Sequence, residues 1–110
     1  MRYVVLGCGA IGATVAAALA RDGHDVLVTD PAADALPLVL DGPVLVDVRA
    51  GQLSAAAAIL AVRLDGAGYA VCLRHGLDAG ILAAAIGPER VAVAAAGRTE
   101  LLVGELANPD

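Results

Sequence analysis

The sequence predicts an α/β fold with a mostly parallel sheet, and two features of the chain indicate it. Short runs rich in Val and Leu alternate with Ala-rich segments whose apolar residues recur at helical spacing, and glycines stand at many of the borders between them. The chain has 110 residues, of which 59% are hydrophobic. It contains no internal repeat and no linker rich in Pro, Gly or Ser, so we expect a single domain over residues 1–110.

The N-terminal segment predicts a strand, a helix and a second strand. Residues 2–6 are a β-prone run, and residues 10–21 place apolar side chains four positions apart on one helical face. Gly23 supplies a residue that accepts the left-handed conformation common at helix C-termini, and residues 25–30 form the next strand. This order is that of a βαβ unit, whose two strands are parallel.

The segment that follows leaves two topologies open. Pro31 can begin a short helix, which Pro37 would end after about one turn. Residues 43–48 are a third strand candidate, reached by a crossover. Alternatively, Asp41 and Gly42 form the turn of a β-hairpin, because this pair accepts the positive φ that such turns need.

The rest of the chain continues the alternation. It predicts a helix over 52–64, a strand over 69–74, a helix over 77–86, a strand over 90–95 and a last strand over 100–103. We therefore expect about five strands in a three-layer α/β/α arrangement.

Charge and composition exclude several classes of protein. The formal net charge is −5, and all seven cationic residues are Arg, with no two adjacent, which argues against a nucleic-acid partner. Gly, Asp or Arg interrupts each apolar run short of the length of a membrane span, and no signal peptide is recognised, so we expect a cytoplasmic protein. Cys8 and Cys72 are expected to be free thiols, and no metal site is predicted.

A glycine-rich turn is the main functional signal. Gly7, Gly9 and Gly12 fit the pattern GxGxxG between a strand and a helix, where the helix N-terminus attracts phosphate. Asp30 follows Gly12 by 18 positions, at the end of the second strand, where a carboxylate can accept hydrogen bonds from a ribose. The alternative is a tight turn that packs a helix and binds no ligand. The pattern favours a Rossmann-like, doubly wound dinucleotide-binding domain. The candidate cofactor-binding residues are Gly7, Cys8, Gly9, Ala10, Ile11, Gly12, Asp30 and His75.

The choice of dinucleotide depends on Asp30. A carboxylate at this position repels a 2′-phosphate, and no Arg occurs between Asp30 and Arg49 to attract one. The sequence therefore favours NAD(H) slightly over NADP(H).

The motifs resemble those of the ketopantoate reductase (2-dehydropantoate 2-reductase) family. The similarity is closest over residues 1–30, which contain Leu-Gly-Cys-Gly-Ala-Ile-Gly and Asp-Gly-His-Asp-Val, and continues in pieces over 43–105. Val-Arg-Ala-Gly-Gln at 48–52 is similar to a family motif V-K-A-x-Q, and His-Gly-Leu-Asp at 75–78 is similar to an N-G-hydrophobic-G turn. The resemblance implies an oxidoreductase of pantothenate biosynthesis, which transfers hydride from NADPH to a 2-keto acid.

The chain also departs from the family pattern. Family members close a Rossmann domain against a C-terminal helical domain that carries a proton-donating lysine, and this sequence contains no lysine and ends at Asp110. A second family lysine, at the end of the third strand, is replaced here by Arg49, whose guanidinium stays protonated. His75 replaces a family asparagine. We therefore assign no catalytic residue and expect cofactor binding without full turnover by this chain alone. Arg49, Gln52 and His75 are candidate substrate-binding residues.

Two further expectations concern partners. The competing functional class is a non-catalytic sensor or interaction module that binds NAD(H). A hydrophobic chain without the helical domain of its relatives should also expose apolar surface, which predicts a homodimer or a separate helical partner domain.

Overall fold

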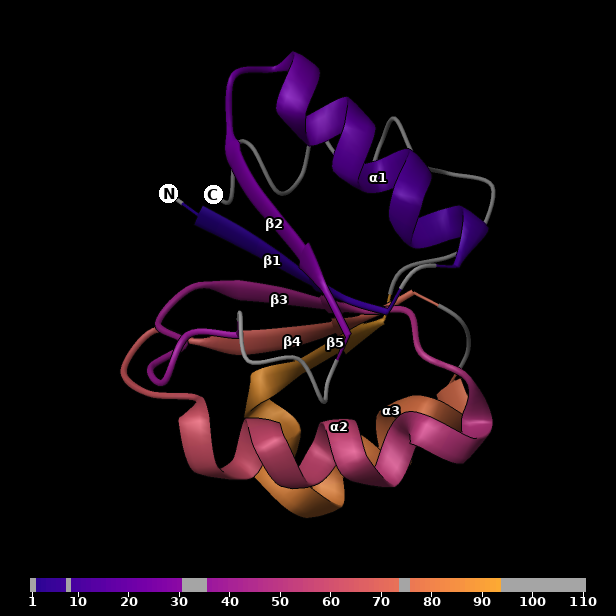
Figure 1. Ribbon diagram of the computed structural model, residues 1–110. Coiled ribbons are helices and arrows are strands. Elements are labelled where there is room, and N and C mark those ends of the chain that lie inside the picture. The colour runs from indigo at the N-terminus through magenta and orange to yellow at the C-terminus, as the bar shows by residue number, and fades with distance from the viewer. Residues whose placement is uncertain (1, 8, 31–35, 74–75, 94–110) are drawn as a thin grey trace.

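The computed structural model describes residues 2–7, 9–30, 36–73 and 76–93, and within them it shows one parallel sheet between two layers of helices (Figure 1). The strands are β1 (Arg2–Leu6), β2 (Asp25–Thr29), β3 (Pro43–Val46), β4 (Tyr69–Cys72) and β5 (Val91–Val93). The helices are α1 (Ala10–Arg21), α2 (Ala50–Arg63) and α3 (Gly76–Ile86), with a short 3₁₀ turn η1 (Pro88–Arg90) before β5. The expected α/β class and the three layers are confirmed.

The strand order is β2-β1-β3-β4-β5, and every pairing is parallel. This is a doubly wound, Rossmann-like arrangement, in which the chain builds outward from β1 first in one direction and then in the other. Helix α1 covers one face of the sheet, and α2 and α3 cover the other (Figure 1).

The first βαβ unit has the predicted boundaries to within one residue. Strand β1 alternates its side chains between the two faces, so that Tyr3 and Val5 pack with residues of α1 while Val4 and Leu6 pack in the core under α2. Helix α1 ends where Gly23, at φ +88°, donates its amide hydrogen to Ala20 O, with an N–O distance of 3.0 Å. This is the expected left-handed C-terminal turn.

The connection between β2 and β3 is a crossover, and the alternative hairpin is wrong. Val44 pairs with Val4 of β1 in parallel, so the segment before β3 has to cross from the β2 side to the other side of β1. Leu40 forms a parallel bridge with Leu64, and the Arg63 guanidinium donates to Leu36 O at 2.9 Å. The short helix expected at Pro31 begins outside the described residues.

The remaining elements are close to their expected bounds, with α2 beginning two residues earlier than predicted and η1 not predicted at all. Cys72 is buried in β4, in the core below α2. The strand expected over 100–103 and the thiol of Cys8 lie outside the described residues. No helix in the described ranges is long and apolar enough to cross a bilayer.

Candidate functional site

The carboxyl ends of β1, β2 and β3 meet at one edge of the sheet. Leu6 is in register with Thr29 on one side and with Val46 on the other. The residues that come next are Gly7, Asp30 and Asp47, so these three leave the sheet at the same level. Two backbone hydrogen bonds connect the strand ends at this point: Gly7 N donates to Thr29 O at 2.9 Å, and Asp47 N donates to Leu6 O at 2.8 Å.

This edge is where the strand order reverses. The chain passes from β1 to β2 on one side and reaches β3 on the other side, so the connections after β1 and β3 lead to helices on opposite faces. In open α/β sheets, ligands bind in the crevice outside the strand ends at this point.

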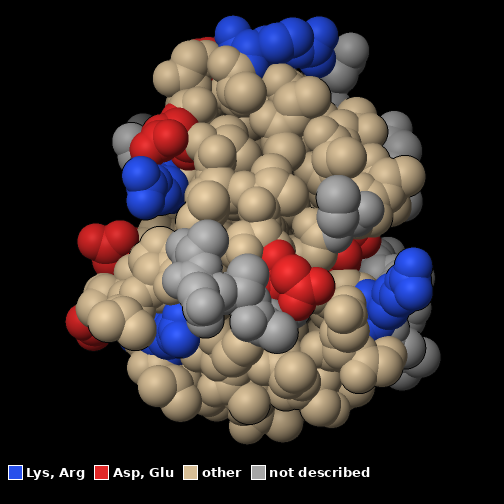
Figure 2. Space-filling view, in the orientation of Figure 1, with Lys and Arg blue, Asp and Glu red and all other residues tan. Residues whose placement is uncertain are grey.

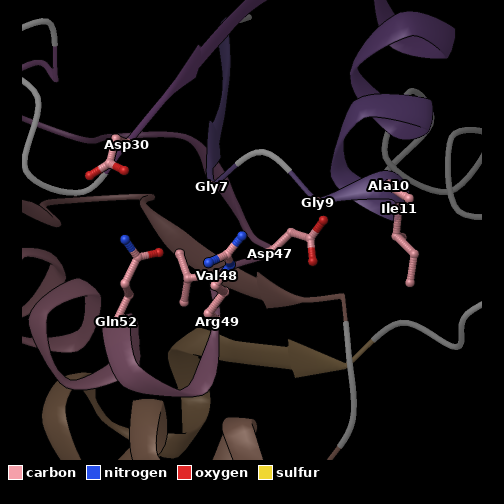
Figure 3. Close-up of a pocket in the computed structure, with 9 residues that line it drawn as sticks. All are labelled: Gly7, Gly9, Ala10, Ile11, Asp30, Asp47, Val48, Arg49 and Gln52. Carbon is pink, nitrogen blue, oxygen red and sulfur yellow. The ribbon is translucent and has the colours of Figure 1, made fainter.

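A pocket of about 480 Å³ lies at the reversal point, and most of the predicted site residues line it (Figure 3). Its lining residues are Gly7, Gly9, Ala10, Ile11, Asp30, Asp47, Val48, Arg49 and Gln52. Three strand ends, the glycine turn and the start of α2 thus converge on one cavity.

The turn between β1 and α1 needs glycine for two different reasons. Gly7 has φ +97°, a conformation that other residues rarely adopt, and a Cβ there would overlap the backbone carbonyl of Asp47. Gly9 has an ordinary extended conformation, with φ −76° and ψ 171°, so its backbone does not require glycine. A Cβ at Gly9 would instead overlap the carboxylate of Asp47, at 2.8 Å from Cγ.

Asp47 is a buried carboxylate beneath the start of α1. Its exposed fraction is 8%, and its Oδ2 accepts a hydrogen bond from the Gly12 amide at 2.8 Å. A Cβ at Gly12 would lie 2.9 Å from the same oxygen. In Figure 3 the carboxylate points from β3 toward Gly9 and the beginning of the helix.

The hydrogen bond to Gly12 replaces a conventional helix cap. The N-cap residue of α1 is Gly9, which has no side chain to accept from the first turn, and that turn contains no acidic residue. The first amides of any helix lack partners within the helix. Asp47 therefore caps one of them from a distant strand, and Ala10 and Ile11, the first two residues of the helix, line the pocket.

Asp30, Arg49 and Gln52 are exposed side chains on the wall of the pocket. Arg49 is the N-cap of α2, and its carbonyl accepts from the Gln52 amide at 2.8 Å. In Figure 3 the side chains of Arg49 and Gln52 extend from the start of α2 toward the side of the cavity formed by the glycine turn and Asp30. A guanidinium there can bind a carboxylate through two parallel hydrogen bonds.

The structure brings together seven predicted residues, namely Gly7, Gly9, Ala10, Ile11, Asp30, Arg49 and Gln52. Gly12 lies behind the lining, against Asp47 and Val5. Cys8 and His75 lie outside the described residues, so their predicted roles stay predictions. Sequence analysis missed Asp47 and Val48, and the signal that could have found Asp47 is an acidic residue directly after an apolar strand.

Charges elsewhere are dispersed on the face seen in Figure 2, where the blue Arg atoms form separate groups between tan, uncharged surface. In the described parts of the chain, no three His, Cys, Asp or Glu side chains are grouped to hold a metal ion.

Comparisons with known proteins support the resemblance. The model of the family "Ketopantoate reductase PanE/ApbA" matches residues 3–42, from β1 to the residue before β3. The predicted resemblance to this family is confirmed over those residues. No curated protein matches the chain.

A solved structure shares the fold. It is that of a protein from Enterococcus faecalis named as a candidate 2-dehydropantoate 2-reductase, with a TM-score of 0.66 and 19% sequence identity. The match covers 84% of this chain and 40% of that protein, so the chain spans less than half the length of the protein it matches. The similarity confirms the Rossmann-like architecture.

Proposed function

We propose that this chain is a nicotinamide-dinucleotide-binding domain related to ketopantoate reductases. The observation that carries the proposal is that the glycine turn and Asp30, separated by a whole helix and strand in the sequence, line one pocket at the reversal point of the sheet. The family match over residues 3–42 covers the same turn and the same aspartate.

The residues fit such a cofactor in most respects. The positive end of α1 and the amides of Ala10 and Ile11 suit a pyrophosphate, and the Asp30 carboxylate at the end of β2 suits the hydroxyls of the adenosine ribose. Arg49 and Gln52, after β3, would then lie toward the nicotinamide half. The Asp47 carboxylate, at the start of α1, does not favour a pyrophosphate.

The bound nicotinamide would supply hydride chemistry, and the protein would supply orientation. Arg49 would hold the carboxylate of a 2-keto acid such as 2-dehydropantoate, without releasing a proton, because a guanidinium stays charged. We therefore propose binding of cofactor and keto acid without full turnover by this chain alone. The sensor function, the homodimer and the helical partner domain stay predictions.

The preference for NAD(H) is a proposal that depends on Asp30. Its exposed carboxylate lies in the pocket, and a 2′-phosphate placed against it would bring two negative groups together.

Isothermal titration of the chain with NADH and with NADPH tests the proposal. We expect both to bind, NADH more tightly, and Asp30→Ala to weaken NADH binding by about 10- to 100-fold, because a hydrogen bond to a charged group contributes about 1.5–3 kcal/mol. Asp22→Ala is the matched control, since it removes an exposed carboxylate at the other end of α1 and should leave NADH affinity unchanged. If neither NADH nor NADPH binds at millimolar concentration, the proposed function is refuted.

A further inference from the structure

We infer that Asp47 lowers the affinity of the pocket for phosphate groups, because it places a fixed negative charge at the start of α1. The inference deepens the proposed function and rests on it. It starts from the contacts of Asp47 with the glycine turn and from the charges around the cavity.

The turn is built around the carboxylate of Asp47. The carboxylate lies where a Cβ atom at Gly9 or at Gly12 would approach it too closely, and the Gly12 amide donates a hydrogen bond to it at 2.8 Å. The side chain is short and 8% exposed, and Asp47 N is bonded to Leu6 O in the continuation of the sheet. The carboxylate therefore has little freedom to withdraw when a ligand arrives.

The same carboxylate removes one attraction for phosphate and adds one repulsion. A helix start attracts anions through its unpaired amides and its dipole, and Asp47 already occupies the Gly12 amide and places a negative charge at the positive end of the dipole. Among the described residues, the charged side chains that line the pocket are Asp30, Asp47 and Arg49, so this part of the lining carries two negative charges against one positive charge. A pyrophosphate on the amides of Ala10 and Ile11 would meet the Asp47 charge directly.

A purely structural role for Asp47 makes a different prediction. If its only function is to cap α1, neutralising it should lower stability and leave ligand affinity unchanged. If it also sets the anion preference, affinity should rise even where stability falls, so the two quantities separate the two roles.

The experiment compares Asp47→Asn with the unaltered chain by titration with NADH and with inorganic pyrophosphate. Asn keeps an oxygen that can accept from the Gly12 amide and removes the charge. We expect about tenfold tighter binding of both probes, the size of effect that one nearby like charge produces in a partly solvated site. The gain should shrink at high salt, because salt screens the repulsion.

Two further variants control the comparison. Asp41→Asn removes an exposed carboxylate before β3, at the opposite end of the strand that Asp47 follows, and should not change affinity for either probe. Asp47→Ser also removes the charge and keeps a hydroxyl acceptor, so it replaces Asp47→Asn if that variant does not fold, as judged by thermal unfolding.

The outcomes distinguish this inference from the proposed function. Equal NADH affinity in the unaltered chain and in a folded, neutral variant would overturn the inference and leave the function standing. Tighter pyrophosphate binding by the neutral variant, without NADH binding by any variant, would support the inference and refute the function. Binding of neither probe by any variant would refute both.

Discussion

Gly9 should be required because of Asp47, and a double-mutant cycle tests this. The backbone of Gly9, at φ −76° and ψ 171°, is accessible to Ala, so Gly9→Ala introduces no backbone strain. Its new methyl group would overlap the Asp47 carboxylate, which would have to rotate away and give up the bond to the Gly12 amide.

The cost follows from that lost bond. A hydrogen bond to a charged group contributes about 1.5–3 kcal/mol, so Gly9→Ala should lower the free energy of unfolding by about 2 kcal/mol. For a domain of this size that is a fall in Tm of roughly 10 °C. In an Asp47→Ala background the methyl group has room, and two small effects of Gly9→Ala remain. Ala stabilises the protein by restricting the unfolded chain, and it destabilises the helix because Gly is the better N-cap residue. These effects are opposite and of similar size, so the substitution should then cost close to zero.

Urea unfolding of the four proteins in the cycle measures the coupling, which we expect to be about 2 kcal/mol. Gly80→Ala is the control: Gly80 is exposed on α3 with no atom within 4 Å of a Cβ placed there, so its effect should be the same in both backgrounds. Additive effects of Gly9→Ala and Asp47→Ala on the free energy of unfolding would refute the reasoning that the Asp47 carboxylate is what requires glycine at position 9.

Two other predictions concern the core. Leu45→Ala, in the central strand at 0% exposure, should cost about 3 kcal/mol in urea unfolding, whereas Leu38→Ala, at 79% exposure, should cost under about 0.5 kcal/mol; equal costs would contradict the described packing. Burial, and then the neighbouring Tyr69, raise the pKa of the Tyr3 phenol. The Tyr3 phenol therefore loses its proton at a lower pH in the unfolded chain than in the folded one. Its contribution to stability should be complete below about pH 10 and be lost as pH rises through the higher folded pKa. Tyr3→Phe should lessen this alkaline loss in urea unfolding, and an unchanged pH profile would contradict it.

The first βαβ unit could be predicted from the sequence because local signals specify it. The apolar spacing over residues 10–21 and the positive φ at Gly23 both depend on nearby residues alone, and α1 has the predicted bounds. The glycine pattern likewise located the turn.

The topology after β2 could not be settled in this way. Asp41 and Gly42 are compatible with a hairpin, and the decision lies in the pairing of Val44 with Val4, which are 40 positions apart. No local property of residues 38–46 encodes that contact.

The position of Asp47 depended on the same unknown. The sequence placed Asp47 within the strand expected over 43–48 and gave it no role, and Asp47 becomes buried at the site only because β3 lies beside β1 and its end therefore faces the glycine turn. Arg49 and Gln52, which the sequence marked as candidate substrate-binding residues, line the pocket, whereas the carboxylate of Asp47 at the same pocket was not expected.

Asp47 changes what the glycine pattern means in this chain. In a dinucleotide-binding GxGxxG turn the second glycine allows the close approach of a pyrophosphate, yet the space beside Gly9 is taken by a carboxylate of the protein itself. A bulkier residue at Gly9 would therefore impair the fold whether or not a dinucleotide binds, and loss of binding in such a variant would not identify the site. Neutralising Asp47 has opposite expected effects on stability and on affinity, because a cap is weakened while a repulsion is removed. The change at Asp47, and not one at the glycines, separates a phosphate-binding turn from a turn that only packs a helix.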